Sequence, residues 1–233
     1  MNAVAVGLVL AHDPSRAFQL SAPPSALRRH DAGAKRRGRR ATRGWRRASD
    51  RHDHSVMNQL ERCFLQLHGK ACWGVKRGYG SFLTLEFGKP RLFIREPQAP
   101  PADASRRVRT GLERRLVRVH GQWHLWIYCC EWVVRKGDVV IGDWSSARRI
   151  DRAAQFLDGQ KLSSAAVRPR GSRTRFEFDL GGVLETKPLD RTREQWLLYE
   201  PSGKVLALRA DRKFAYADGD HELRDERWRS LGA

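Results

Sequence analysis

Short runs of alternating hydrophobic and polar residues dominate the chain from Met57 onward. This alternation is typical of half-buried strands, and it predicts strands near residues 72–76, 82–87, 91–95, 116–119, 165–167, 176–180, 183–186, 195–199, 205–208 and 213–216. Turn sequences such as Gly181-Gly182 and Pro201-Ser202-Gly203 separate several of these runs. The pattern predicts an α+β protein that is mostly antiparallel β, arranged as a sheet or a sandwich.

One segment, residues 144–157, has helical periodicity instead. Ala147, Ile150, Ala153, Ala154 and Leu157 recur at helical spacing. A serine at 145 or 146 can cap the start, and a glycine at 159 suits the end. We therefore expect one central helix.

Residues 123–132 form the most apolar run of the chain. Both faces of Trp123–Cys130 are apolar, so we expect one strand through residue 132 in the middle of the core. His120-Gly121 before it is a plausible hairpin turn from residues 116–119. The proline-containing segment 97–111 is expected to be a loop.

Two stretches of the chain are similar to each other, and an internal repeat is one explanation. Leu67-His68-Gly69 corresponds to Leu157-Asp158-Gly159, and the run 83–88 corresponds to 176–181. This predicts two pseudo-repeated β units, residues 67–132 and 157–216, joined by the helix at 144–157. The alternative is that any antiparallel protein gives such matches. In either case we expect Glu86 and Asp179, which occupy matching positions, to face solvent.

The first 56 residues differ from the rest. They carry 12 Lys and Arg against 4 Asp, whereas residues 57–233 carry 33 Lys and Arg against 22 Asp and Glu, a net charge of +11. We expect residues 1–56 to be a disordered Arg-rich extension before a globular β-rich domain at 57–233. The extension could be a start-site artefact, with translation beginning at Met57. Alternatively, it could be a nucleic-acid arm built on Lys35, Arg36, Arg37, Arg39 and Arg40.

Cysteine usage and hydropathy bear on location. The chain has four cysteines, none in a CxxC motif, and no apolar stretch near the roughly 20 residues that a membrane-spanning helix needs. We expect reduced thiols in a cytoplasmic protein that does not bind membranes.

Candidate chemical groups gather around the apolar run, but no spacing assigns them a role. His120, His124, Cys129 and Cys130, with Cys63, His68 and Cys72 upstream, are residue types that bind zinc, yet their spacing fits no zinc motif. Cys129 or Cys130 beside His120 or His124 could form a nucleophile–base pair, but buried cysteine explains the pattern equally well. The acids Glu86, Glu131, Asp179 and Asp190 suggest no particular carboxylate pair. We therefore assign no catalytic residue, no metal ligand and no cofactor.

Four tryptophans close in sequence suggest an interface. Trp123, Trp126, Trp132 and Trp144 fall within 22 residues, and tryptophan is enriched where proteins bind one another. The alternative is that they fill the core between sheet and helix.

The region from Leu67 to about residue 220 resembles an uncharacterised family of bacterial proteins, a domain of unknown function. The resemblance rests on residues 72–75, 123–126, 157–160 and 176–182. The last two motifs also resemble small β-rich immunity proteins of toxin systems. The resemblance implies a compact cytoplasmic protein that binds a partner, with no catalytic residues to carry over.

Three functions remain open at this point. A non-enzymatic, immunity-like module that binds another protein is the first hypothesis. Nucleic-acid binding through the basic N-terminal segment and the basic surface is the second, and an enzyme with an unrecognised site is the third. The sequence leans away from the enzyme because no set of titratable groups converges.

Overall fold

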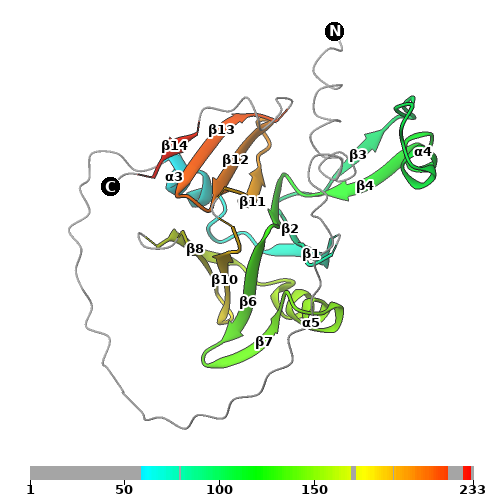
Figure 1. Ribbon diagram of the computed structural model, residues 1–233. Coiled ribbons are helices and arrows are strands. Elements are labelled where there is room, and N and C mark those ends of the chain that lie inside the picture. Colours follow the sequence, from blue (N-terminus) through cyan, green and yellow to red (C-terminus); the bar gives the residue numbers. More distant parts are fainter. Residues whose placement is uncertain (1–58, 79, 169–171, 191, 220–227, 232–233) are drawn as a thin grey trace, which may run out of the picture.

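The computed structural model describes residues 59–78, 80–168, 172–190, 192–219 and 228–231. These residues contain three short helices: α3 (Gln59–Leu65), α4 (Arg106–Leu112) and α5 (Ala147–Leu157) (Figure 1). Helix α5 is the one that the sequence predicts, but the expectation of a single helix is wrong. Helices α3 and α4 have seven residues each, too few to display a clear helical period.

The largest sheet has seven antiparallel strands, in the order β1-β2-β5-β11-β12-β13-β14. The strands are β1 (Cys72–Arg77), β2 (Leu83–Phe87), β5 (Trp123–Ile127), β11 (Glu194–Tyr199), β12 (Lys204–Arg209), β13 (Lys213–Asp218) and β14 (Arg229–Ser230). The mostly antiparallel β architecture expected from the alternation is therefore confirmed.

A second sheet has five antiparallel strands and a third has two. The five-stranded sheet has the order β7-β6-β10-β9-β8, from β6 (Cys130–Lys136), β7 (Val139–Asp143), β8 (Leu162–Val167), β9 (Thr174–Phe178) and β10 (Gly182–Pro188). The two-stranded sheet pairs β3 (Arg91–Arg95) with β4 (Leu116–His120). With α4, this ribbon projects away from the two larger sheets (Figure 1).

The two larger sheets share a five-strand plan, in which three strands from one half of the chain lie next to a pair from the other. These are β1-β2-β5 with β11-β12, and β8-β9-β10 with β6-β7; the seven-stranded sheet continues beyond β12 with β13 and β14. The helices cross over in the same manner, since α5 contacts β1 and α3 contacts β8. The two halves of the chain therefore exchange strands and share one folded body.

Reciprocal backbone hydrogen bonds join the two halves where they meet. The N–H of Gly69 donates to the carbonyl of Leu162, and the N–H of Gly159 donates to the carbonyl of Cys72, both at 2.8 Å. The glycines have φ angles of 75° and 87°, which favour glycine. The two bonds are related by a shift of 90 residues, since Gly69 corresponds to Gly159 and Cys72 corresponds to Leu162. That the halves arose by duplication stays a prediction of the sequence.

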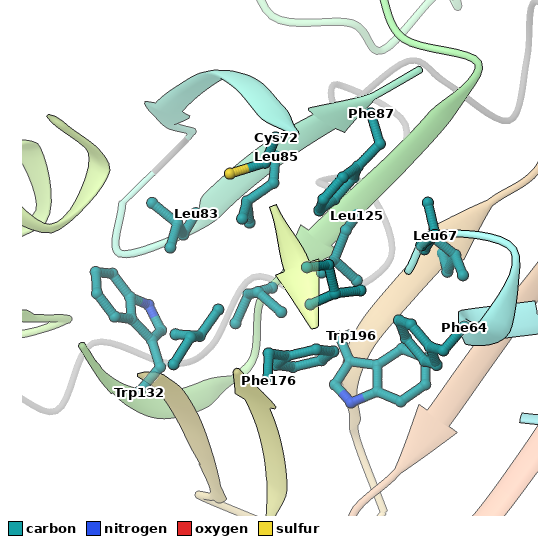
Figure 2. Close-up of a cluster of buried hydrophobic side chains, with 14 of the residues drawn as sticks. Phe64, Leu67, Cys72, Leu83, Leu85, Phe87, Leu125, Trp132, Phe176 and Trp196 are labelled. Atoms are coloured by element: carbon teal, nitrogen blue, oxygen red, sulfur yellow. The ribbon is translucent and has the colours of Figure 1, made fainter. Parts of the chain in front are cut away.

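The main core lies between the two larger sheets and under the helices (Figure 2). Phe64 of α3 packs edge-on against Phe176 and Trp196, with ring centroids 5.5 and 5.4 Å apart. Trp132 is also fully buried, and its indole N–H donates to the carbonyl of Ser81 at 2.8 Å. Aromatic edge contacts thus stabilise the packing between the two halves, and the buried indole of Trp132 has a hydrogen-bond acceptor.

The continuous strand expected over residues 123–132 is wrong. The chain breaks at Cys129, whose φ of 49° is unusual for a residue with a side chain. Strand β5 ends before it in the seven-stranded sheet, and β6 begins after it in the five-stranded sheet. The kink lets one apolar run serve both sheets.

The hairpin expected at His120-Gly121 is also wrong. Strand β4 pairs with β3, whereas β5 pairs with β2 and β11. Gly121 lies against strand β2, where an added Cβ would be 2.4 Å from the carbonyl oxygen of Phe87. This glycine permits a close approach of two backbones and does not form the tip of a hairpin.

Candidate functional site

A buried polar cluster lies where the projecting ribbon joins the seven-stranded sheet. Its centre is Glu86, on strand β2, whose five residues are all buried. Glu86 pairs in register with His124 on β5, so the two side chains share one face of the sheet. His120 ends strand β4 and brings a second imidazole to that face.

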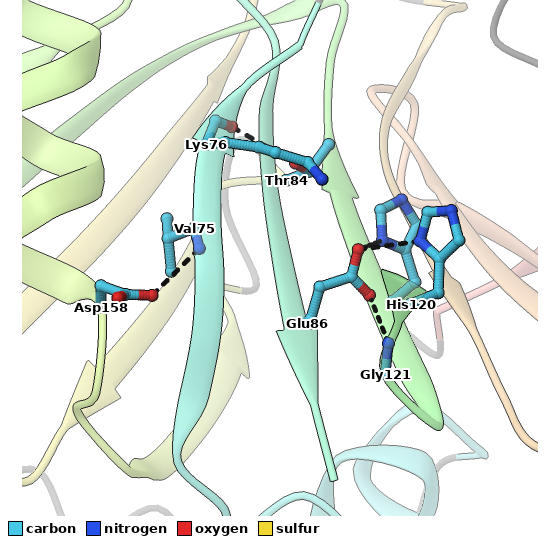
Figure 3. A network of polar contacts seen from close by, with 8 residues as sticks. Val75, Lys76, Thr84, Glu86, His120, Gly121 and Asp158 are labelled. Carbon is cyan, nitrogen blue, oxygen red and sulfur yellow. Dashed lines mark hydrogen bonds and ion pairs between the residues drawn. The ribbon is translucent and has the colours of Figure 1, made fainter. Parts of the chain in front are cut away.

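One carboxylate oxygen of Glu86 contacts both imidazoles (Figure 3). Its Oε1 lies 2.9 Å from Nδ1 of His120 and 2.9 Å from Nδ1 of His124. Its Oε2 accepts the backbone N–H of Gly121 at 2.9 Å. Three donors thus fix the position and orientation of one carboxylate.

The cluster lies almost entirely out of water. Glu86 has no exposed surface, and the side chains of His120 and His124 are 9% and 11% exposed. Burial by itself would raise the pKa of Glu86, but the contacts with His120, His124 and Gly121 outweigh it and hold the pKa well below its usual range. Glu86 is therefore an ionised carboxylate inside the protein.

The expectation that Glu86 faces solvent is wrong. Its side chain shares a sheet face with Trp126, which belongs to a second apolar cluster that also contains Leu197 and Tyr199. This cluster fills the face that the alternation suggests is wet. Asp179, which the sequence comparison matches to Glu86, follows the end of β9 and is exposed as expected.

The cysteines that the sequence places among the candidate ligands are not part of the cluster. In the described part of the chain, one group of three or more ligand-type side chains converges, and it is Glu86, His120 and His124. All four thiols are free. Burial raises the pKa of Cys63 and of Cys72 to about 12, so neither is an activated nucleophile.

Cys129 and Cys130, the proposed partners of a histidine base, have other surroundings. The Cys130 thiol donates to the carbonyl of Gln195 at 3.4 Å, and burial raises its pKa. Burial also raises the pKa of Cys129, although Arg193 partly offsets this. Both thiols are protonated at neutral pH.

The four tryptophans do not form one exposed face. Trp123, Trp126 and Trp132 are buried, and Trp144 is 37% exposed. Three of the four tryptophans therefore fit the alternative that these side chains fill the core. Trp144 borders a surface depression that also contains Arg175 and Glu185.

Most of the positive charge in that depression is compensated. Arg175 contacts both Glu177 and Glu185 at 2.8 Å, and Lys187 contacts Glu131 at 2.8 Å. Arg168 lies 3.7 Å from Glu185, so three of the five cations that line the depression are paired with carboxylates.

The projecting ribbon presents the second candidate site. We define the arm as residues 89–120, which include β3, α4 and β4. Leu92 pairs with Val119 and Ile94 pairs with Val117, so all four side chains lie on one face of the ribbon. They are 67%, 47%, 46% and 55% exposed, respectively. This is an exposed aliphatic face on a protruding element, and among the described residues no other strand pairs with the ribbon.

The arm is strongly basic and internally braced. It contains 9 Lys and Arg against 3 Asp and Glu, a net charge of +6. The guanidinium of Arg95 is buried and donates to the carbonyls of Gly111 and Leu112 at the end of α4, at 2.7 and 3.4 Å. Ser105 caps the start of α4 by accepting the N–H of Val108. The segment expected to be a loop at 97–111 therefore holds most of a helix tied to the ribbon.

The proposed nucleic-acid arm at Lys35, Arg36, Arg37, Arg39 and Arg40 lies outside the described residues. No helix within the described ranges is long and apolar enough to cross a membrane.

Comparisons with known proteins do not identify a relative. No protein-family model, curated protein or solved structure matches the chain. The function is therefore argued from the arm and the buried cluster alone.

Proposed function

We propose that the chain is a non-enzymatic binding module whose arm docks into an apolar groove on an acidic protein. The observation that carries this proposal is the aliphatic face of Leu92, Ile94, Val117 and Val119. Exposed apolar patches on a soluble fold commonly mark binding sites. An immunity-like inhibitor, which blocks its target with a rigid element, is the most specific form of the proposal.

The chemistry of the partner follows from comparing the free energy that burial of the aliphatic face contributes with the free energy that association costs. Full burial of one such aliphatic side chain is worth about 1.5–3 kcal/mol. Since each is already about half covered, docking gains roughly 1 kcal/mol per side chain, or about 4 kcal/mol in all. Association costs at least about 4 kcal/mol, so the apolar face alone gives no stable complex. The net charge of +6 on the arm must contribute, and an acidic rim on the partner lets it do so.

The aliphatic face favours a protein over a nucleic acid. Nucleic-acid surfaces are read by cations, hydrogen-bonding side chains and aromatic rings. Aliphatic side chains with polar or charged surroundings are typical of protein interfaces. The arm combines both features, because exposed Arg114 and Arg115 directly precede β4 and exposed Arg118 lies within it.

A photo-crosslinking experiment followed by reconstitution tests the proposal. A photoreactive residue replaces Val117 on the arm or, as a control, Val139, which is 63% exposed on β7. A protein captured at 117 and not at 139 is identified and purified. Its affinity is then measured for the wild type, for Leu92→Ser/Val119→Ser and for the control Val139→Ser/Val140→Ser.

We expect the arm variant to bind more than about tenfold more weakly and the control to bind as the wild type does. Binding should also weaken with added salt. Equal affinity of the arm variant and the wild type would refute the proposal. Two other outcomes also overturn it: capture of a second copy of this chain, or nucleic-acid binding that persists in the arm variant and disappears in Arg114→Ala/Arg118→Ala.

A further inference from the structure

We propose that Glu86, His120 and His124 bind a divalent first-row transition-metal ion, with zinc as the first probe. Two imidazole nitrogens and one carboxylate oxygen are ligands that zinc uses in proteins with an open coordination position. The three ligand atoms all lie within 4.8 Å of one another. The inference does not depend on the function proposed for the arm.

The distances within the cluster suit a shared ion. Zinc lies about 2.0–2.2 Å from nitrogen and oxygen ligands, so two ligands of one ion are roughly 2.9–3.4 Å apart. The Oε1 atom of Glu86 is 2.9 Å from each histidine Nδ1. An ion can therefore replace these two contacts once the Nδ1 atoms of the two rings, which lie within 4.8 Å of each other, close to the same spacing. On binding, each ring presents an unprotonated Nδ1, and its proton moves to Nε2 or to solvent.

The surroundings already orient the carboxylate. The N–H of Gly121 holds Oε2 of Glu86 at 2.9 Å, which leaves Oε1 directed at the two rings. Hydrogen bonds of this kind to the second oxygen position ligands in metal sites. The backbone at Gly121 is itself constrained because it packs against Phe87.

Charge balance also favours a cation at this place. Glu86 is fully buried, and a buried carboxylate charge is costly unless an opposite charge compensates it. A divalent ion supplies that charge at the point where the three ligands meet. In the competing arrangement, a proton on one imidazole supplies the compensating positive charge, and no metal ion binds.

The donor set narrows the class of metal. Calcium and magnesium prefer oxygen ligands, whereas imidazole suits zinc, iron, copper and nickel. The histidine side chains keep 9% and 11% exposure, so the cluster lies close to the protein surface. The ion would connect the end of β4 to β5 and β2 and so fix the base of the arm.

Zinc titration of the chelator-treated full chain, followed by calorimetry, tests the proposal. The variants are His120→Ala, His124→Ala and Glu86→Gln. The matched control is His68→Ala, which removes an exposed histidine outside the cluster. Far-UV circular dichroism without metal checks that each variant is folded. Cobalt(II) absorption of the wild type gives a second readout that needs no variant.

We expect one saturable zinc site in the wild type and in His68→Ala. Loss of a ligand should weaken zinc binding more than about 100-fold. Loss of a residue that only hydrogen-bonds to a ligand typically weakens metal binding by roughly 10–100-fold, so the larger effect identifies a direct ligand. The cobalt spectrum should show nitrogen and oxygen ligands without a thiolate charge-transfer band. Absence of saturable binding, undiminished binding by His120→Ala/His124→Ala, or a thiolate band would each overturn the proposal.

Discussion

Replacing Glu86 by alanine should lower the free energy of unfolding by about 3–5 kcal/mol, the usual cost of breaking a buried charged contact. The structure shows how this sum arises. The buried N–H of Gly121 loses its acceptor, which costs about 1–3 kcal/mol. His120 and His124 each lose a 2.9 Å contact but keep some solvent access, so each contributes roughly 1 kcal/mol.

Urea unfolding followed by far-UV circular dichroism measures this loss. A chelator is present throughout, so that any bound metal makes no contribution to the difference. Asp179→Ala is the matched control because Asp179 is exposed and accepts one backbone N–H, that of Lys161, at 2.8 Å. We expect the control to lose about 1 kcal/mol, with the same dependence on urea.

The reasoning would be refuted if Glu86→Ala remained within about 1 kcal/mol of the wild type. Such a result would mean that the carboxylate is solvated or that its partners find other acceptors. An equal loss in Asp179→Ala would also refute it, since burial would then make no difference.

Three further predictions concern backbone packing, buried thiols and the arm. Gly121→Ala should destabilise the fold by more than about 2 kcal/mol through the clash with Phe87, and Gly111→Ala, with open space around it, should be neutral or stabilising in thermal melts. Buried Cys72, with its pKa raised to about 12, holds a proton that the unfolded chain releases near pH 9, so stability should fall as pH rises above about 9. Urea midpoints at pH 7.5 and 10 measure this fall, which should be smaller in Cys72→Ala. Replacing residues 96–115 by Asn-Gly should leave the sheets folded, since α4 has no buried residue and closing the shorter loop costs up to about 2 kcal/mol less. Circular dichroism and urea unfolding check this prediction, and an unfolded product would contradict it.

The strands were predictable because their signal is local. Residues 176–178 and 205–208 alternate or run apolar, and turn residues mark their ends. The structure places strands there, as β9 and β12. Short helices such as α4 were not predictable, since seven residues give too few turns for a periodic pattern.

The break at Cys129 was not predictable from residue type. Cysteine rarely adopts a positive φ, and nothing in the apolar run marks that position as a kink. The change of sheet depends on strands from the other half of the chain, because β5 pairs with β11 and β6 pairs with β10. Tertiary pairing therefore decides where the strand ends.

The buried cluster was hidden for a related reason. Glu86 lies 34 residues before His120 and 38 before His124 in sequence. The register of β2 with β5 brings Glu86 and His124 together, and the end of β4 brings His120 to them. The available signal was weak: a carboxylate within a strongly apolar run, and two histidines shortly after another strand. Alternation alone assigned Glu86 to a wet face, because it cannot show that a second apolar cluster covers that face.

A comparison of the two halves shows that the fold does not require the arm. In the second half, β9 ends at Phe178 and β10 begins at Gly182, so a short turn joins them. In the first half, β2 ends at Phe87 and β5 begins at Trp123, at the same places in the sheet order, and the arm fills the interval. The glycines that follow β2 and β9, Gly88 and Gly181, both have positive φ, at 76° and 87°.

The arm is thus an addition to a connection that a turn can make. The aliphatic face of the arm is exposed, and α4 buries no side chain, so these two parts of the arm add little to the stability of the core. Exposed apolar surface also favours aggregation. The docking that we propose for the arm would account for a segment that stabilises the fold so little and carries this liability. The polar cluster at its base provides a rigid attachment for such an element.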